Sequence, residues 1–314
     1  MTGTLPATAA DLASLERALG PRAERHHPLG ALTTYRVGGM ASLFVEPADE
    51  AELLDVARCL EGLHVPVVVL GRGSNMLVAE AGFDGLAISL GAGFDSLAID
   101  GRQVRAGAAV SLPVLARRTA AAGLSGLEWA VGVPGSVGGA IRMNAGGHGS
   151  DTAATLVAVR WVDLASASVH ETAAGWLAPS YRHTALAPTD VVVAGVYELE
   201  PGDPDRGAAT IAEVVRWRRA HQPGGSNAGS VFVNPVGDSA GRLIEGCGLK
   251  GFRIGSAEVS TKHANFIQAD PDGSADDVAR LIDHVRSTVA TATGVELRTE
   301  VRLLGFDQRP PGAP

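Results

Sequence analysis

A glycine-dense stretch between residues 123 and 150 constrains this chain most, because it matches no regular helix or strand. It contains six glycines between positions 132 and 147, in the runs Gly132–Ala140 and Met143–Gly147. A turn needs one or two glycines, whereas a dense run lets the backbone approach a bound molecule closely. Loops of this length inside a compact domain are usually functional. The stretch therefore predicts a binding loop, with Ser136 and Asn144 as its hydrogen-bonding side chains.

Another glycine loop, Gly71–Asn75, directly follows the apolar run Val65–Leu70, which is typical of an interior strand. In chain order, Gly71–Asn75 is the first glycine loop and residues 132–147 form the second. Its successive N–H groups, with the side chains of Ser74 and Asn75, form a pattern that can cradle a diphosphate. It is not a Rossmann fingerprint, because Met76 begins another strand-like segment. It is not a P-loop, because no Gly-Lys-Ser or Gly-Lys-Thr occurs. A plain tight turn is the alternative for this loop alone, but two such loops favour a bound dinucleotide over a nucleotide that is hydrolysed.

The charge and cysteine content exclude several classes of protein. The net charge of −8 provides no basic stripe for a nucleic acid. No apolar run approaches the roughly 20 residues of a membrane span, and the N-terminal residues show no secretory signal. Two distant cysteines, Cys59 and Cys247, and the lack of a metal-binding spacing predict reduced thiols and no metal site. We expect a soluble cytoplasmic protein without nucleic-acid or membrane partners.

Helix and strand signals alternate along the chain, which indicates a mixed α and β protein. Helices are predicted at residues 10–19, 49–62, 111–123, 208–220 and 274–294, and strands at 65–70, 154–163, 191–199 and 295–304. Proline, glycine and aspartate make Pro201–Gly207 the clearest linker. We therefore divide the chain into residues 1–200 and 207–305, followed by a Pro-rich tail at 306–314.

Short motifs along nearly the whole chain resemble one family of flavoproteins. The two glycine loops are similar to the flavin-diphosphate loops of FAD proteins in the vanillyl-alcohol-oxidase-like group. Further motifs follow in one family's order: Thr34–Gly39, Tyr181–Arg182, Asn227–Pro235, Ala240–Glu245, Gly248–Gly251, Lys262–Ile267 and Glu300–Arg302. Because these motifs occur together and in order, the chain resembles the UDP-N-acetylenolpyruvoylglucosamine reductase (MurB) family.

The resemblance implies an α+β fold. Residues 1–200 are expected to form a vanillyl-alcohol-oxidase-like (PCMH-type) FAD-binding domain of two α/β subdomains, about 1–95 and 96–200. Residues 207–305 are expected to form a C-terminal α+β substrate-binding domain. One branch of the family carries an inserted loop whose tyrosine covers the substrate. A linker, a helix and a turn fill residues 200–230 here, so the chain resembles the branch without that loop.

The family's reaction reduces UDP-N-acetyl-3-O-(1-carboxyvinyl)-glucosamine to UDP-N-acetylmuramate, a peptidoglycan precursor. The resemblance implies NADPH as co-substrate and hydride transfer from N5 of FAD to the terminal carbon of the enolpyruvyl group. Asn75 stands where some flavin oxidases of the wider group carry a flavin-attaching histidine, so we expect the FAD to be non-covalent. The implied protein is a cytoplasmic monomer that binds a UDP-sugar.

Three residues match the family's catalytic positions. Arg182 is expected to grip the substrate carboxylate, since a guanidinium forks onto two oxygens. Ser230 matches the proton donor, and a positioned donor contributes about 10²–10⁴ in rate. Glu300 matches an acid near that carboxylate, where one of two adjacent carboxyls holds a proton. From the residues alone, a surface arginine, a serine in a turn and an exposed ion pair are the alternatives.

The resemblance also implies binding residues. FAD is expected to contact Gly71, Arg72, Gly73, Ser74, Asn75, Val133, Pro134, Gly135, Ser136, Gly138, Gly139, Asn144 and Gly146. The UDP-sugar is expected to contact Tyr181, Arg218, Gln222, Asn234 and Asn265. The family often has Ala-Tyr-Gly where this chain has Gly147-His148-Gly149, which leaves the role of His148 open.

Two other functions stay open at this point. One is a flavin-dependent carbohydrate oxidase on the same scaffold, because a fold does not determine a chemistry. The other is a non-catalytic FAD-binding module. The segment Ser230–Asn234 and Glu300 favour the reductase, because an oxidase has no use for a proton donor opposite the flavin.

Overall fold

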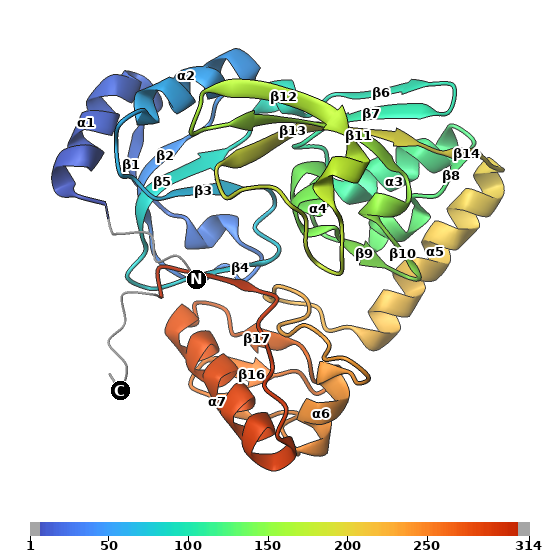
Figure 1. Ribbon diagram of the computed structural model, residues 1–314. Helices are drawn as coiled ribbons and strands as arrows, with labels where there is room; N and C mark the ends of the chain where they lie inside the picture. Colours follow the sequence, from blue (N-terminus) through green and yellow to red (C-terminus); the bar gives the residue numbers. More distant parts are fainter. Residues whose placement is uncertain (1–6, 307–314) are drawn as a thin grey trace. The chain divides into compact units, whose positions relative to one another are not determined.

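A computed structural model describes residues 7–306 of the 314-residue chain. These residues form two compact units, whose elements are drawn in Figure 1. The first unit consists of residues 7–25, 43–72 and 85–218, and the second of residues 26–42, 73–84 and 219–306. Each unit is therefore assembled from segments that lie far apart in the sequence.

The α-helices are α1 (Ala9–Leu19), α2 (Glu50–Leu60), α3 (Leu112–Ala121), α4 (Val137–Met143), α5 (Pro204–His221), α6 (Ala240–Gly246) and α7 (Ala275–Thr293). The strands are β1 (Glu24–His27), β2 (Ala41–Val45), β3 (Val67–Leu70), β4 (Met76–Val78), β5 (Phe83–Ser89), β6 (Leu97–Asp100), β7 (Gln103–Gly107), β8 (Leu124–Ser125), β9 (Gly146–Gly147), β10 (Ser150–Asp151), β11 (Leu156–Asp163), β12 (Ser168–Ala173), β13 (Asp190–Glu198), β14 (Glu200–Pro201), β15 (Arg253–Ile254), β16 (Ala257–Val259), β17 (Ile267–Ala269) and β18 (Arg302–Leu304).

The first unit contains a five-stranded antiparallel sheet of order β12-β11-β13-β7-β6 (Figure 1). Helix α4 packs against β13, and a buried cluster that includes Leu115, Ile141 and Tyr197 joins α3, α4 and this sheet. A second cluster joins α1 and α2 to β5 through Leu15 and Leu53. Strand β3 lies at the edge of a four-stranded sheet of order β1-β2-β5-β3 and pairs in parallel with β5.

In the second unit, the long helix α7 packs on a three-stranded antiparallel sheet of order β15-β16-β17. The helix begins after Ser274, whose side chain accepts a hydrogen bond from the N–H of Asp276, and it ends at Gly294, where φ is 74°. Its buried face shares one apolar cluster with Tyr35 and Leu77. Strand β4 pairs in parallel with β18, so the first glycine loop enters this unit beside the C-terminal strand.

All the predicted helices are confirmed, as α1, α2, α3, α5 and α7. The predicted linker is wrong in part, because α5 begins at Pro204 inside it, at a first-turn position that proline tolerates. The stretch 123–150 is not irregular throughout, because it contains α4. The glycines Gly138 and Gly139 lie inside that helix, which Ser136 caps.

Two strand predictions need correction. The run Val65–Leu70 contains β3, but this strand lies at a sheet edge and not in an interior position, and Val67 and Val69 are only partly buried. The segment 295–304 is predicted as one strand, and Leu297 and Val301 in it are buried, yet only β18 within it is a regular strand. The division of the chain at the linker stays a prediction. The compact units differ from it, since residues 26–42 and 73–84 join the C-terminal part.

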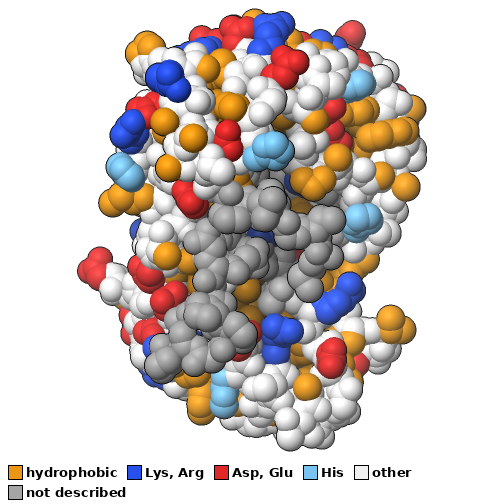
Figure 2. Space-filling view, turned by 60° about the vertical axis from the view of Figure 1, so that its left-hand side comes forward, with side chains coloured by type: hydrophobic (Ala, Val, Ile, Leu, Met, Phe, Trp, Pro, Cys, Tyr) orange, Lys and Arg blue, Asp and Glu red, His pale blue; other side chains and the backbone are white. Residues whose placement is uncertain are grey.

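The surface of the described residues carries mixed charge. On the face in Figure 2, Lys and Arg side chains lie among Asp and Glu side chains, apart from the area that grey atoms cover. An example is Arg160, which pairs with both Glu50 and Glu171. Among the helices within residues 7–306, none is long and apolar enough to cross a membrane.

Candidate active site

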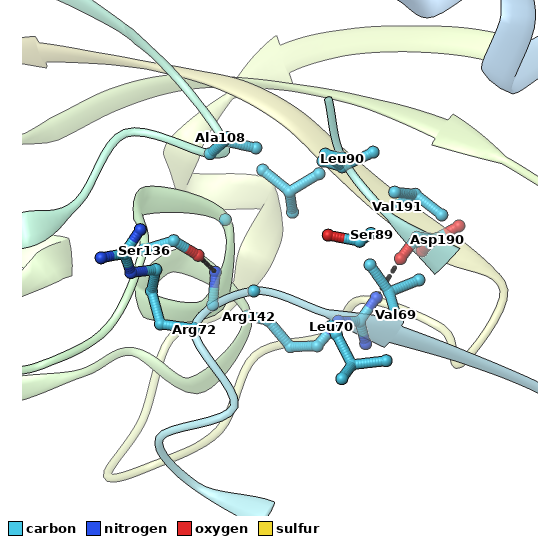
Figure 3. A pocket seen from close by; sticks show the side chains of 15 residues that line it. Val69, Leu70, Arg72, Ser89, Leu90, Ala108, Ser136, Arg142, Asp190 and Val191 are labelled. Atoms are coloured by element: carbon cyan, nitrogen blue, oxygen red, sulfur yellow. Dashed lines mark hydrogen bonds between the residues drawn. The ribbon is translucent and has the colours of Figure 1, made fainter. Parts of the chain in front are cut away.

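A pocket of about 170 Å³ in the first unit lies at the end of β3 (Figure 3). Both predicted glycine loops contribute to it, the first through Gly71 and Arg72 and the second through the start of α4. Its lining residues are Val69, Leu70, Gly71, Arg72, Ser89, Leu90, Ala108, Ala109, Ser136, Gly138, Gly139, Arg142, Asp190, Val191 and Val192. Most of them are small or aliphatic, with a few charged groups, as is usual for ligand pockets.

Two glycines of this pocket leave no room for a side chain. A Cβ at Gly71 would stand 2.4 Å from Oγ of Ser136, and a Cβ at Gly138 would stand 2.9 Å from Cβ of Ala108. Contacts this short are overlaps, so a side chain at Gly71 would displace the Ser136 hydroxyl that caps α4, and one at Gly138 would press on Ala108. The two loops, far apart in the sequence, therefore meet in the first unit.

Hydrogen bonds hold the second loop in place. The N–H of Gly138 donates to the carbonyl oxygen of Ala108 at 2.9 Å. Oγ of Ser136 accepts from the N–H of Gly139 at 3.4 Å and caps α4. The loop is thus anchored on the segment that follows β7.

The first loop leaves backbone donors available. Gly73 has φ of 59°, and a Cβ there would stand 2.3 Å from the carbonyl oxygen of Leu32. Its own carbonyl accepts from the N–H of Thr34 at 3.1 Å. The N–H groups of Arg72 and Ser74 donate to no backbone carbonyl within residues 7–306. Such groups, adjacent in a turn, can bind an anion.

Sequence reasoning missed Arg142 and Asp190 in the pocket wall. The Arg142 guanidinium donates to the carbonyl oxygens of Asp190 and Ala187, the latter at 3.0 Å, and Figure 3 shows it between α4 and the start of β13. A carboxylate oxygen of Asp190 accepts from the N–H of Ala187 at 2.7 Å. Arg142 and Asp190 are 48 positions apart, so no local sequence signal marks this pair.

Arg182 lies beside the hairpin of β9 and β10 in the first unit. Its Nη2 donates to the carbonyl oxygen of Gly146 at 3.1 Å, and its Cζ stands 5.0 Å from the centre of the Tyr181 ring. Its φ of 57° is uncommon for a residue with a side chain and indicates local strain. These three residues line an open pocket together with Asn144 and Asp151. The structure thus brings together four residues that the sequence assigned to FAD or the UDP-sugar.

Asn144 is buried and holds this region together. Its Nδ2 donates to a carboxylate oxygen of Asp151 at 3.1 Å and to the carbonyl oxygen of Ser180 at 3.2 Å. Its Oδ1 accepts from the N–H of Ala153 at 3.0 Å. The amide therefore ties the hairpin to the segment that carries Arg182, and the FAD contact expected of Asn144 stays a prediction.

His148, at the tip of the same hairpin, packs on α5. Its ring meets Trp217 edge-on, with the ring centres 5.0 Å apart. A Cβ at Gly132 would stand 3.3 Å from Cδ of Arg218 and 3.5 Å from Nε2 of His148. Burial lowers the pKa of the Arg218 guanidinium. His148, which stands where the family often has a tyrosine, thus has a packing role. Arg218 lies beside the second glycine loop.

In the second unit, Ser230 and Glu300 lie on adjoining stretches of chain. The N–H of Glu300 donates to the carbonyl oxygen of Val231 at 2.8 Å. Thr299 forms an antiparallel bridge with Phe232. The proton donor and the acid expected from the sequence are therefore close neighbours across one strand pairing, and both residues are partly buried.

Asn75 is bonded to the same stretch. Its Nδ2 donates to the carbonyl oxygen of Glu300 at 3.1 Å, and its own carbonyl accepts from the N–H of Arg302 at 3.0 Å. The end of the first glycine loop is thereby tied to the backbone of Glu300. The Asn75 side chain, which the sequence analysis assigned to FAD, thus forms a hydrogen bond within the protein.

The other residues expected to bind the UDP-sugar differ in accessibility. Oδ1 of the exposed Asn234 accepts from the N–H of Ala240 at 3.0 Å, at the start of α6. Gln222, after α5, is partly buried. Asn265 is only 3% exposed, and its side chain bonds to the backbone of Phe232.

The three expected catalytic residues lie in different units. Arg182 belongs to the first unit, and Ser230 and Glu300 belong to the second. That all three act on one substrate stays a prediction.

Comparisons with known proteins identify the family. Residues 221–304 match the family model described as UDP-N-acetylenolpyruvoylglucosamine reductase, C-terminal domain, and residues 41–173 match the FAD binding domain. The UDP-N-acetylenolpyruvoylglucosamine reductase of Heliobacterium modesticaldum is 43% identical over 286 residues, which cover 90% of this chain and 90% of the relative. The chain belongs to the UDP-N-acetylenolpyruvoylglucosamine reductase family. The relative from Rubrobacter xylanophilus is 43% identical over 291 residues, 91% of this chain and 97% of its own length.

A solved structure of this reductase family agrees in fold. The crystal structure of UDP-N-acetylenolpyruvylglucosamine reductase (MurB) from Thermus caldophilus matches with a TM-score of 0.79 and 35% identity, covering 90% of this chain and 99% of that one. The family predicted from the motifs is confirmed, as is an α+β fold with an FAD-binding domain. The chain is therefore an oxidoreductase of the UDP-N-acetylenolpyruvoylglucosamine reductase family.

Proposed function

We propose that this chain reduces UDP-N-acetyl-3-O-(1-carboxyvinyl)-glucosamine to UDP-N-acetylmuramate, with NADPH as reductant and FAD as a non-covalent cofactor, acting as a monomer in the cytoplasm. The bond from the N–H of Glu300 to the carbonyl of Val231 carries the proposal, because it holds the chain segment of Glu300 against the segment that carries Ser230. The names of the relatives, all reductases of an enolpyruvoyl UDP-sugar, support the substrate class.

The residues present fit FAD. Gly71 and Gly138 keep the floor of the pocket free of side chains, and the N–H groups of Arg72 and Ser74 are donors for a diphosphate. The side chain of Asn75 is an amide, which is not a nucleophile, so it would form no covalent bond to a flavin. When bound, FAD supplies the hydride-transfer chemistry for which NADPH is the source.

Arg182 has the chemistry to bind the substrate carboxylate. Its guanidinium presents N–H donors in a planar fork that matches two carboxylate oxygens. The bond of its Nη2 to Gly146 orients the fork at the edge of the open pocket. A fixed positive charge there stabilises the negative charge that grows on the carboxylate during reduction.

Ser230 then donates its hydroxyl proton to the carbon next to the carboxylate. A serine hydroxyl is a weak acid, so its effect depends on being held at hydrogen-bond distance from that carbon. Glu300, held beside it, keeps a proton near the substrate carboxylate and donates a hydrogen bond to it.

An anaerobic two-stage experiment tests this proposal. NADPH should bleach the flavin of the purified holoenzyme, and the enolpyruvyl UDP-sugar should then restore its colour with formation of UDP-N-acetylmuramate. Oxygen consumption with simple sugars, and no response to the UDP-sugar, would indicate a carbohydrate oxidase. A yellow protein that NADPH does not bleach would indicate a binding module. Sedimentation of the holoenzyme measures its oligomeric state.

A further inference from the structure

The chain segment that follows Ser230 has a buried side chain as its hydrogen-bonding partner. Oδ1 of Asn265 accepts from the N–H of Phe232 at 2.9 Å, and Nδ2 of Asn265 donates to the carbonyl oxygen of Phe232 at 2.8 Å. The carbonyl oxygen of Asn265 accepts from the N–H of Val231 at 2.9 Å. One asparagine thus supplies the donor and acceptor that a neighbouring strand would supply in a sheet.

The opposite side of the same segment is paired with the stretch that carries Glu300. The N–H of Glu300 donates to the carbonyl of Val231 at 2.8 Å, and the N–H of Val233 donates to the carbonyl of Arg298 at 2.9 Å. The segment therefore lies between Asn265 on one side and residues 298–300 on the other. Ser230 directly precedes this segment, so the position of the serine depends on both partners.

Burial makes the hydrogen bonds of the Asn265 side-chain amide costly to lose. Asn265 is 3% exposed, Phe232 is 1% exposed and Val231 is fully buried. Water cannot replace a missing partner there, and a buried unpaired backbone group is strongly unfavourable. Without the amide, the backbone on which Ser230 sits would have to move to satisfy its polar groups.

We propose that Asn265 is a positioning residue that fixes Ser230 beside Glu300 through the backbone of Phe232 and does not itself contact the UDP-sugar. The inference rests on the proposed function, because the exact place of Ser230 matters only if Ser230 donates the proton. It replaces the substrate contact that the sequence suggested for Asn265, whose amide faces the protein backbone and is closed to solvent.

Asn265→Asp separates positioning from general stability. The introduced carboxyl has nearly the shape of the amide. When ionised, one of its oxygens accepts from the N–H of Phe232, but the other faces the carbonyl oxygen of Phe232 and repels it. When protonated, it has an O–H that donates to that carbonyl, which restores both bonds. Burial favours the protonated form, so the switch should fall within the pH range that enzymes tolerate.

The experiment measures two rates on the holoenzyme between about pH 5 and pH 8, a range around the carboxyl pKa raised by burial. In N265D, anaerobic bleaching of the flavin by NADPH should match the wild type at every pH. Reoxidation by saturating UDP-sugar should be slower than in the wild type by about tenfold to a hundredfold at pH 8 and recover towards pH 5. KM for the UDP-sugar should change little.

Two controls identify the group that titrates. The backbone N–H of Asn265 donates to Nδ1 of His263 at 3.3 Å, and burial lowers the pKa of His263. The wild type contains His263 too, so only a pH limb present in N265D and absent in the wild type supports the proposal. Ser260→Ala removes another buried hydroxyl between β16 and β17, one that accepts from the backbone N–H of Lys262 at 3.2 Å, and it should leave both rates unchanged.

Several outcomes would overturn the inference. One is wild-type reoxidation by N265D at all pH values. Another is a raised KM with an unchanged rate at saturation, which would indicate a substrate contact. A third is a variant that stays unfolded at pH 5, where both bonds should be restored. If the wild-type flavin is bleached but the UDP-sugar does not reoxidise it, the proposed function has failed, and this failure is visible without any variant.

Discussion

The two units prepare their parts of the candidate site in opposite ways. In the first unit the glycine loops meet because side chains are absent, as the 2.4 Å between a Cβ at Gly71 and Oγ of Ser136 shows. In the second unit the stretches around Ser230 and Glu300 are held because side-chain amides are present, from Asn75 and Asn265. A diphosphate needs space and backbone donors, whereas a proton donor needs a fixed position. Substitutions in the first unit should therefore weaken FAD binding, whereas substitutions in the second unit should slow reoxidation by the UDP-sugar.

The largest effect is expected for Ser230→Ala in the second unit. The variant should keep its flavin and its bleaching by NADPH, because it changes no group of the glycine loops. Reoxidation by the UDP-sugar should slow by about 10²–10⁴, the usual contribution of a positioned proton donor. Stopped-flow absorbance of the flavin measures both rates, and Ser226→Ala in the same turn is the matched control. A variant that turns over like the wild type would mean that water or another side chain protonates the carbon.

The opposite pattern is expected for Gly71→Ala in the first unit. The new Cβ would overlap Oγ of Ser136, and overpacking of this kind typically costs about 1–3 kcal/mol. FAD should therefore bind about tenfold to a hundredfold more weakly, while the enzyme that retains flavin should be reoxidised normally. Flavin titration of the apoprotein measures the affinity. Gly175→Ala is the control, because apart from its chain neighbours no described atom lies within 4 Å of a Cβ there. Equal flavin affinity in the two variants would contradict the close-approach interpretation.

A smaller effect on stability alone is expected for Ser274→Ala. The hydroxyl of Ser274 accepts from the N–H of Asp276 at 3.1 Å and caps α7. Its loss should lower the free energy of unfolding by about 1 kcal/mol. Urea unfolding measures this change, and flavin affinity should stay constant because Ser274 is not among the residues that line the pocket of the first unit. Ser287→Ala, at an exposed position farther along α7 that caps no helix start, should have less effect.

The smallest effect is a pH dependence in the first unit. A bidentate hydrogen bond from Arg160, with both N···O distances at 2.8 Å, lowers the pKa of Glu50. A carboxyl with a lowered folded-state pKa stabilises the fold above its unfolded pKa of about 4.3, and this stabilisation is lost as the pH falls through the folded value. Glu50→Gln should cost under about 1 kcal/mol at pH 7, since the pair is partly exposed. It should also flatten the acid limb of the unfolding free energy, and an acid limb identical to that of the wild type would contradict this role of the Glu50–Arg160 pair.

Local signals explain how much of the fold could be predicted. Asp49 and Ser274 mark helix starts, and Gly294 marks a helix end, because a cap acts within one turn of the chain. The start of α5 was missed because proline suits both a linker and a first helical turn. Strand β3 was taken as interior because its sequence is apolar throughout, although only one of its sides pairs with another strand.

The sequence by itself determined the family, since its motifs lie in order along the chain, and through the family it named Arg182, Ser230 and Glu300. The tertiary structure alone decided that Gly71 meets Ser136, that Arg142 closes a wall of the pocket, and that the amide of Asn265 turns to Phe232 and not to solvent. The physical reason is the separation along the sequence over which each kind of interaction acts. Turn and cap preferences act between residues a few positions apart, whereas overlaps and buried hydrogen bonds join residues that become neighbours only after the chain has packed.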